Sequence, residues 1–403
     1  MENQKLKILS LEEALAVAYS NAQALQVEKV LFKNSLGRIL ATDVFSDMDM
    51  PPFNKSAMDG YACRREDLGN ELTVLETIPA GSSPTLPITK NCCSKIMTGA
   101  QVPEGADTVI IIEFSEETTE GKIRFTGEKT SSNICLEGED LQKGSLVLSK
   151  GTLIKSQHLA MLAAVGCTEP EVYKQPEIGI ISTGSELVEP GEKISPSKIR
   201  NSNGHQLVAQ CEELGIKATY YGITPDNKNI TQEAIKKSTT ENDLTIISGG
   251  VSVGDFDFVP LAIRENGFEI LFKRLTVKPG QHTIYAIKNT TSGKRKYIIG
   301  LPGNPVSSFI QFELFVKPFV YKLQEKDWKE VVIPVQMAQD YSRRKANRTE
   351  YLPVILNDNN EAELVKYNGS AHIHAYHNAF GVISIAMGQT EIKKGDKVYV
   401  RPL

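Results

Sequence analysis

The stretch LTIISGGVSVGDFD, residues 244–257, decides the fold of this chain. Its first residues, 244–247, form a short apolar run that predicts a buried strand. Ser248, Gly249 and Gly250 follow, and the two glycines allow the backbone to adopt positive φ and approach a ligand closely. A loop with Asp255 and Asp257 then leads to a helical pattern over 259–266. In this order an α/β fold presents backbone N–H groups and carboxylates at the carboxyl edge of its sheet.

The pattern on either side of this stretch predicts an α/β domain over residues 177–325. Apolar strands alternate there with helical segments, which favours a doubly wound, mostly parallel sheet with helices on both faces. Residues 45–140 are predicted to form an inserted β-rich domain, because the turns are close together. Residues 1–44 and 141–176 are predicted to form one discontinuous linking domain. Short strands return over 326–403 and predict a C-terminal β domain.

Length and composition exclude several classes of protein. The chain has 403 residues, a net charge of −4 and no apolar run of membrane-spanning length, so we expect neither a nucleic-acid-binding nor a membrane protein. The N-terminus lacks the apolar core of a signal peptide, which predicts a cytoplasmic location. The six cysteines have no paired spacing apart from one adjacent pair, which favours reduced, mostly buried thiols.

Carboxylates follow successive strands of the predicted sheet. Glu186, Asp226, Asp255 and Asp257 each stand where a strand ends, and parallel strands bring those ends to one edge. Mg²⁺ is held in proteins by one or two carboxylates together with phosphate oxygens, so the spacing predicts a metal–phosphate site. The alternative is that these acids cap helices or solvate a loop. The glycines match neither a P-loop nor a dinucleotide-binding pattern, which disfavours an ATPase or a dehydrogenase.

Basic residues and histidines give weaker signals. Lys273, Arg274 and Lys278 are close to the same edge and can neutralise an oxyanion, although a solvated strand end is the alternative. If residues 372–374 form a strand, His372 and His374 share a face and are a conceivable metal pair, but ordinary surface or core histidines are favoured. No Ser/His/Asp set with an elbow motif is present, so positioning and electrostatics are favoured over covalent catalysis.

Several motifs resemble those of one family, the molybdopterin molybdenumtransferases, which comprise the bacterial MoeA-type enzymes and the C-terminal domain of gephyrin. The motifs are PPFNKSAMDGYA (51–62), IMTGAQVPEGAD (96–107), GEDLQKG (138–144), ISTGSEL (181–187), SGGVSVGDFD (248–257), KPG (278–280) and GLPGNPVSS (300–308). The resemblance covers essentially the whole chain in the same order. It implies an elongated homodimer of four-domain chains.

The activity implied by the resemblance is the insertion of molybdenum from molybdate into adenylylated molybdopterin, with release of AMP and a requirement for Mg²⁺. By position, Asp59 and Thr98 would come from the partner subunit. The remaining implied site residues fall into groups: Glu186, Asp226 and Asp255 at the metal and nucleotide phosphates; Ser248, Gly249 and Gly250 at the nucleotide; Lys273, Lys278 and the loop Pro302, Gly303, Asn304 and Pro305 around the pterin and the oxyanion; and Arg348 and Ser370, with Lys278, at molybdate.

Two positions depart from the pattern of the family. Gln281 stands where members commonly have a second lysine, which leaves open whether molybdate or tungstate is preferred. Cys135 stands in a segment where members commonly have arginine. Two other functions remain as alternatives: a molybdopterin adenylyltransferase, which the isolated α/β domain also resembles, and a gephyrin-like scaffold. The resemblance also leaves open contacts with the adenylyltransferase and with molybdoenzymes that receive the cofactor.

Overall fold

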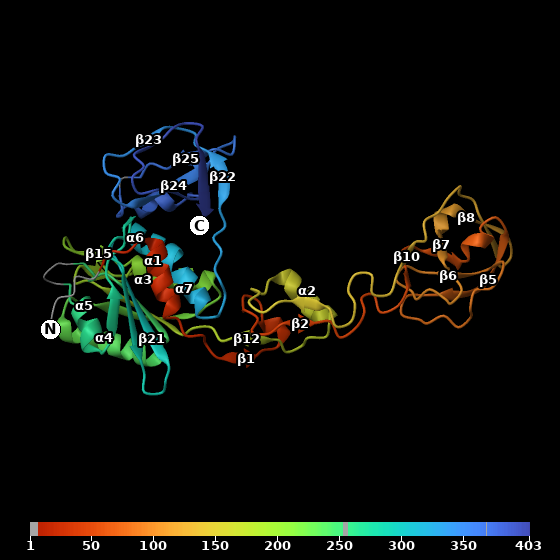
Figure 1. Cartoon of the computed structure of the whole chain (residues 1–403), viewed down its shortest axis with the longest axis horizontal. Helices are drawn as coiled ribbons and strands as arrows, with labels where there is room; N and C mark the ends of the chain where they lie inside the picture. Colours follow the sequence, from red (N-terminus) through yellow and green to blue (C-terminus); the bar gives the residue numbers. More distant parts are fainter. Residues whose placement is uncertain (1–6, 253–256, 368) are drawn as a thin grey trace.

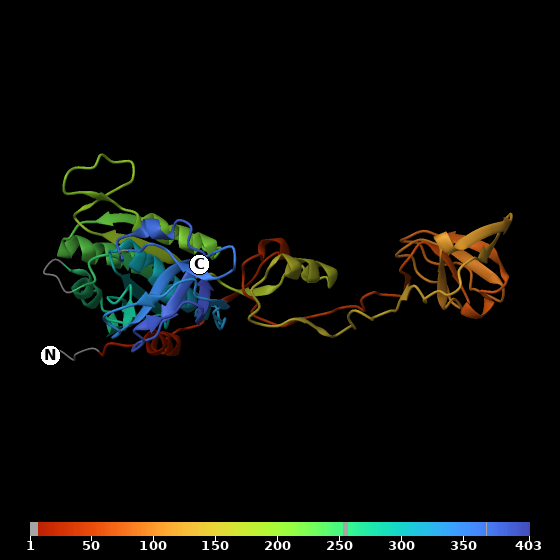
Figure 2. The same cartoon turned by 90° about the horizontal axis from the view of Figure 1, so that it is seen from above.

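The chain is strongly elongated in the computed structural model, which describes residues 7–252, 257–367 and 369–403. The α/β domain and the C-terminal β domain lie together at one end (Figure 1). The inserted β domain forms the opposite end, and the linking domain lies between them, joined to the inserted domain by two extended segments (Figure 2). None of the helices in the described residues combines the length and the apolar character that a bilayer crossing needs.

The α/β domain is built on one sheet of order β16-β13-β17-β21-β20-β18. Neighbours from β16 to β21 are parallel, and β20 runs antiparallel to both β21 and β18. Every residue of β13 and β17 is buried, as expected for a parallel sheet covered on both faces. The strands are β13 (Ile178–Thr183), β16 (Ala218–Thr224), β17 (Leu244–Ser248), β18 (Glu269–Phe272), β20 (Ile284–Asn289) and β21 (Arg295–Leu301), with the short parallel pair β14 (Leu187–Val188) and β15 (Ile199–Arg200) beside them.

Helices cover both faces of this sheet. One hydrophobic cluster contains buried residues of α3, α6 and α7, and a second contains those of α4 and α5. The prediction of a doubly wound α/β fold is therefore confirmed. The helices are α3 (Asn203–Glu213), α4 (Lys228–Glu241), α5 (Val259–Glu265), α6 (Pro305–Gln311) and α7 (Lys317–Lys322), with the π-helix η4 (Phe312–Val316) between the last two.

The first helix belongs to the α/β domain and not to the linking domain in which the sequence placed residues 1–44. Helix α1 (Leu11–Ser20) begins with a capping box in which Ser10 accepts from the Glu13 N–H and the Glu13 carboxylate accepts from the Ser10 N–H. Its buried residues Leu11, Ala14 and Ala18 recur every three or four positions, so they share one face. That face packs into the same hydrophobic cluster as α7.

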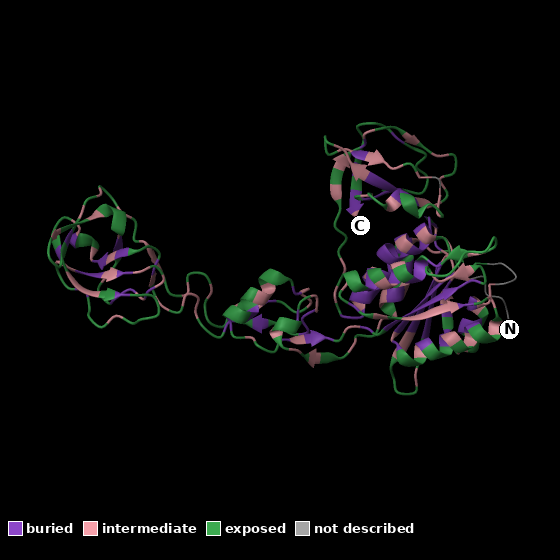
Figure 3. Cartoon of the chain, turned by 180° about the vertical axis from the view of Figure 1, so that it is seen from behind, coloured by how far each residue is buried: buried purple, intermediate pink, exposed green. Residues whose placement is uncertain are grey.

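The linking domain is small and has a modest core of its own. It consists of two antiparallel strand pairs, one 3₁₀ helix and one α-helix. Helix α2 buries only Leu162, and much of this middle region is coloured exposed in Figure 3. The elements are β1 (Val27–Lys29) with β12 (Glu171–Tyr173), β2 (Val44–Phe45) with β11 (Leu146–Leu148), η1 (Phe32–Asn34) and α2 (Ser156–Ala164).

The inserted domain contains a sheet of order β7-β4-β6-β5-β9-β8, beside the short pair β3 and β10. Its strands are close to one another along the chain, in accord with the dense turns of the sequence. They are β3 (Lys55–Ser56), β4 (Gly60–Cys63), β5 (Glu71–Ile78), β6 (Cys92–Ile96), β7 (Thr108–Ile111), β8 (Ser115–Thr119), β9 (Lys122–Phe125) and β10 (Ile134–Cys135), with the 3₁₀ helices η2 (Arg65–Asp67) and η3 (Ile112–Phe114).

The C-terminal β domain shares a strand with the α/β domain. Strand β19 (Val277–Lys278) leaves the α/β domain and pairs in parallel with β24, so that Lys278 lies opposite Glu350. The resulting sheet has the order β19-β24-β26-β28-β22, with β25 paired to β24. The other elements are β22 (Ile333–Gln336), β23 (Tyr341–Ser342), β24 (Thr349–Leu356), β25 (Ala362–Leu364), η5 (Ile373–Tyr376), β26 (Gly381–Ile385), β27 (Glu391–Ile392) and β28 (Lys397–Pro402).

Candidate functional site

A cavity of about 590 Å³ lies at the carboxyl edge of the α/β sheet. The segments that follow β13, β16, β17 and β21 line it, because parallel strands end at the same edge. Most of the residues proposed for metal, nucleotide or pterin are brought together here. They are Glu186, Asp226, Ser248, Gly249, Gly250, Pro302, Gly303, Asn304 and Pro305.

Gly249 and Gly250 form a wall of the cavity that a side chain would obstruct. Their φ angles are +94° and +63°, a region that other residues rarely adopt. A Cβ on Gly249 would lie 2.3 Å from the Thr183 carbonyl oxygen, and one on Gly250 would lie 2.8 Å from Thr183 Oγ1. The absence of both side chains lets the loop after β17 pack directly against the end of β13.

Asn203 connects the two loops that flank the cavity. Its Nδ2 donates to Ser248 Oγ and to the Gly303 carbonyl oxygen, each at 2.8 Å. Sequence reasoning missed this residue, because an asparagine at the start of a predicted helix is usually assigned to capping. Asn203 is also the first residue of α3, and Ser202 before it makes no side-chain capping bond. Residues 201–203 at the N-terminal end of α3 line the cavity, and the Gly204 N–H donates to Asn201 Oδ1 at 3.1 Å. The positive end of the helix dipole at this position favours anions.

The carboxylates at this edge are partly engaged with the backbone. Asp226 Oδ2 accepts from the Ser185 N–H at 2.8 Å, and the Asp226 N–H donates to Ser185 Oγ at 2.9 Å. Glu186 folds back over Gly184, where a Cβ would lie 2.6 Å from the carboxylate. Asp257 also lines the cavity, whereas Asp255 lies outside the residues that the structure describes. Within the described part of the chain, no group of three or more His, Cys, Asp or Glu residues is arranged to hold a metal ion.

A second polar cluster lies where β19 meets β24. The Lys278 Nζ lies 2.6 Å from Glu350 Oε1, and Arg343 Nη1 lies 3.3 Å from Glu350 Oε2. The Tyr341 hydroxyl also donates to Glu350, at 3.2 Å, and Glu350 is only 2% exposed. The lysine that the sequence marked as an oxyanion ligand therefore has a buried carboxylate partner. Sequence reasoning missed Glu350, since only the long-range pairing of β19 with β24 brings it to Lys278.

The two other residues proposed for molybdate lie near this cluster or at the cavity. Arg348 Nη1 donates to Gln281 Oε1 at 3.3 Å. Ser370 Oγ accepts from Asn304 Nδ2 at 2.9 Å, and its neighbour Ala371 lines the cavity. Ser370 thus lies beside the cavity, and Arg348, directly before β24, contacts the loop that carries Gln281. Lys273 is not among the lining residues; burial, with a contribution from Arg264, lowers the pKa of its ammonium group.

The comparisons with known proteins agree on one family along the chain. Residues 9–166 match the MoeA N-terminal region (domain I and II), residues 179–322 a probable molybdopterin binding domain, and residues 336–403 the MoeA C-terminal region (domain IV). This chain belongs to the MoeA family.

Relatives and solved structures of MoeA proteins cover most of the chain. A molybdopterin molybdenumtransferase of Staphylococcus epidermidis is 38% identical over 85% of this chain and 83% of its own length. The enzyme of that name from Staphylococcus aureus is 36% identical over 79% and 76%. The crystal structure of the molybdopterin biosynthesis MoeA protein of Pyrococcus horikoshii superposes with a TM-score of 0.83 at 30% identity, over 98% of this chain and all of that one.

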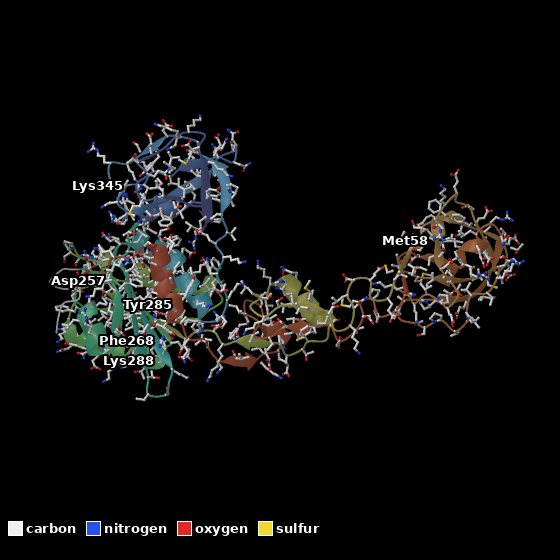
Figure 4. All side chains as sticks on the ribbon, viewed as in Figure 1. Met58, Asp257, Phe268, Tyr285, Lys288 and Lys345 are labelled. Atoms are coloured by element: carbon white, nitrogen blue, oxygen red, sulfur yellow. The ribbon has the colours of Figure 1, made fainter. Side chains whose placement is uncertain are left out.

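Asp59 and Thr98 lie in the inserted domain of this MoeA chain. The Thr98 N–H and hydroxyl donate to Asp59 Oδ1 at 2.6 and 2.7 Å, and these two bonds lower the pKa of the exposed Asp59 carboxyl. Figure 4 labels Met58, which precedes Asp59, and Asp257 beside the cavity, and the linking domain separates them along the molecule. A single chain therefore does not bring Asp59 and Thr98 to the cavity.

The histidine pair does not form as the sequence suggested. Residues 373–376 form the 3₁₀ helix η5 and not a strand, because the Ala375 N–H bonds to the His372 carbonyl oxygen and the His377 N–H bonds to that of His374. The alternating geometry that would place His372 and His374 on one face is therefore absent.

Proposed function

We propose that this chain is a molybdopterin molybdenumtransferase that inserts molybdenum from molybdate into adenylylated molybdopterin and releases AMP. The observation that carries the proposal is the cavity of about 590 Å³ at the sheet edge, with the candidate oxyanion residues of the C-terminal domain beside it. Membership of the MoeA family and the names of its relatives support the same role in molybdenum cofactor biosynthesis.

On this proposal the nucleotide and the pyrophosphate of the substrate bind at the loops that carry Ser248 and Gly303. The cavity volume is within the range of small-molecule sites in proteins. The start of α3 and the backbone after β17 offer N–H groups to the phosphates, and no side chain of Gly249 or Gly250 intervenes. The hydrogen bonds of Asn203 fix the distance between these two loops and thereby the width of the site.

The donor set of the cavity fits Mg²⁺. Three carboxylates, Glu186, Asp226 and Asp257, line it. Mg²⁺ is usually held by one or two carboxylates, substrate phosphates and water, without a cage of protein ligands, and Glu186 and Asp226 are the proposed ligands. Asp255 remains a proposed third ligand from its position in the sequence alone. When bound, Mg²⁺ would polarise the phosphoanhydride. The chain itself supplies the orientation of the phosphates through the N–H groups of the loops.

Molybdate is proposed to bind among Lys278, Arg348 and Ser370. The carboxylate of Glu350 offsets part of the positive charge of Lys278. The proposed molybdate site therefore carries less positive charge than Lys278 and Arg348 would give it without Glu350. Gln281 accepts a hydrogen bond from Arg348 and contributes no charge. Competition between molybdate and tungstate, measured by calorimetry on the wild type and on Gln281→Lys, tests the preference. A change in the ratio of the two affinities is expected if Gln281 contributes to selectivity.

The complete site is proposed to need two chains, with Asp59 and Thr98 supplied by a second copy. The linking domain offers an apolar surface for such a contact: Phe45 and Leu146 are cross-strand neighbours that are 54% and 50% exposed. An apolar hollow of about 330 Å³ lies beside them, lined by Leu146, Met161 and neighbouring residues. Exposed apolar surface of this kind is typical of protein interfaces.

The activity is tested by supplying adenylylated molybdopterin with and without molybdate. AMP release that depends on molybdate and Mg²⁺ and that stops on addition of EDTA is expected. A molybdopterin adenylyltransferase would instead consume ATP and molybdopterin, so ATP-dependent formation of the adenylylated compound, with no response to molybdate, would contradict the proposal.

The shared site is tested by mixing subunits of two inactive variants, Asp59→Asn and Asp226→Asn. Random pairing makes half of the dimers mixed, and each mixed dimer has one intact site of two, so about one quarter of wild-type activity should return. Each variant alone should stay inactive. A mixed preparation without activity, in which mixed dimers are demonstrated by differential tagging, would show that Asp59 and Asp226 do not act across the subunit boundary.

A further inference from the structure

His282 is the only histidine among the cavity-lining residues that the structure describes. It is partly buried and follows Gln281, whose side chain accepts from Arg348. The loop of residues 278–282 therefore has Lys278 beside Glu350 at one end and His282 at the cavity at the other. His282 lies at the junction of the proposed nucleotide–pterin cavity and the proposed molybdate residues. It is not part of any of the family motifs, and the proposed mechanism gives it no role.

The proposed reaction needs a proton carrier at this junction. An ene-dithiol, R(SH)₂, and MoO₄²⁻ give R(S)₂MoO₃²⁻ and H₂O. Two S–H bonds and one Mo–O bond break, two Mo–S bonds and two O–H bonds form, and molybdenum stays in the +6 state. Both thiol protons thus end on the oxygen that leaves as water. A group that accepts a proton from sulfur and delivers it to oxygen, near neutral pH, accelerates such a transfer.

The neighbouring charged groups are poorly suited to this task. Arg348 carries a guanidinium, which offers hydrogen-bond donors and no acceptor. Glu350 is buried and already accepts from Lys278, Arg343 and Tyr341. Glu186 and Asp226 line the cavity and are already the proposed ligands of Mg²⁺. A neutral imidazole has one donor and one acceptor nitrogen, so it can accept a proton from sulfur and donate one to oxygen.

The surroundings of His282 keep its imidazole neutral at pH 7. Burial lowers its pKa below the ordinary 6.5, and the positive charges of Arg274 and Arg348 lower it further, while Asp257 acts in the opposite direction. A neutral imidazole can accept the first proton, whereas an imidazolium cannot. The acid limb of a rate profile controlled by His282 should accordingly lie below pH 6.5.

We propose that His282 is a catalytic residue that carries protons from the dithiol of molybdopterin to the molybdate oxygen that leaves as water. This inference rests on the proposed function and adds to it a named proton carrier. The proposal predicts that replacement of His282 slows the insertion step and leaves the binding of both substrates unchanged.

The experiment compares wild type, His282→Ala and the matched control His377→Ala, which removes an exposed histidine outside the cavity lining. Molybdenum incorporated into the supplied adenylylated molybdopterin is measured by mass spectrometry of the metal at saturating molybdate, from pH 5.5 to 8.5. Binding of AMP and of molybdate is measured separately by calorimetry. For His282→Ala we expect a loss of kcat of about 10²–10⁴-fold. We also expect binding within twofold of wild type, loss of the acid limb, and partial rescue by added imidazole.

Each outcome decides between the two proposals. A wild type that releases no AMP and incorporates no molybdenum overturns the proposed function and the inference with it. An active wild type whose His282→Ala variant keeps more than half of the rate, with the same pH profile, overturns the inference alone. Loss of activity together with loss of AMP or molybdate binding, without rescue by imidazole, assigns His282 a structural role and also overturns it.

Discussion

Replacing Gly249 by alanine should disable the cavity and cost more stability than a glycine substitution whose Cβ meets no neighbour, because the new Cβ meets backbone. The new Cβ would lie 2.3 Å from the Thr183 carbonyl oxygen, whereas real Cβ contacts essentially never fall below 3.0 Å. The loop after β17 must therefore move by about 0.7 Å, the difference between these distances. Because a displacement of about 1 Å in a reacting geometry can cost about 10²-fold in rate, we expect molybdenum transfer to fall at least about tenfold.

Gly222→Ala provides the matched control. Gly222 lies on β16 of the same domain with a φ of +82°, close to the +94° of Gly249, but a Cβ there meets nothing within 4 Å. Both variants should lose about 1–2 kcal/mol of unfolding free energy from the left-handed backbone. Only Gly249→Ala should also lose AMP affinity and transfer rate. Urea unfolding and calorimetry with AMP separate the two effects, and a Gly249→Ala variant as active as Gly222→Ala would refute the reasoning.

Two further substitutions and one labelling experiment test the packing of the chain. Asn203→Ala removes both hydrogen bonds between the flanking loops and should cost about 1–3 kcal/mol in urea unfolding; Asn203→Asp, which cannot donate, should not restore it. Glu350→Gln leaves the buried Arg343 without its carboxylate and should cost about 3 kcal/mol, read from the urea midpoint. Burial raises the pKa of three thiols to about 12, so these should react with Ellman's reagent at pH 8 only after unfolding: Cys63, Cys93 and Cys211.

The sheet edge could be predicted from the sequence because each contribution to it is local. A strand such as 244–248 appears as a continuous apolar run, and Ser248, Gly249 and Gly250 follow it directly. Parallel pairing then brings the ends of such segments together without any knowledge of individual contacts. This is why most of the residues proposed for nucleotide and pterin line one cavity, although they come from distant parts of the chain.

The contacts that sequence reasoning missed depend on long-range packing. The pattern of residues 11–20 predicts an amphipathic helix, but it does not indicate which core the buried face joins, so α1 was placed in the wrong domain. Glu350 becomes the partner of Lys278 only through the pairing of β19 with β24 across two domains. Asn203 is recognisable only once the loops after β17 and β21 are placed beside the start of α3.

The structure of the inserted domain shows how the site proposed to be divided between two chains can still be well ordered. Gly60 of β4 lies opposite Ile96 of β6, so Asp59, just before β4, and Thr98, just after β6, are held together by strand pairing within one domain. The hydrogen bonds between Asp59 and Thr98 form within the inserted domain, without any contact to the cavity. The loops of the cavity are connected by Asn203 within the α/β domain, without any contact to Asp59 or Thr98. Each half is therefore organised before association, and on the proposed dimer only the relative position of the halves remains to be set. On that proposal the linking domain, with its exposed apolar surface around Phe45, is the part of the chain that sets this position.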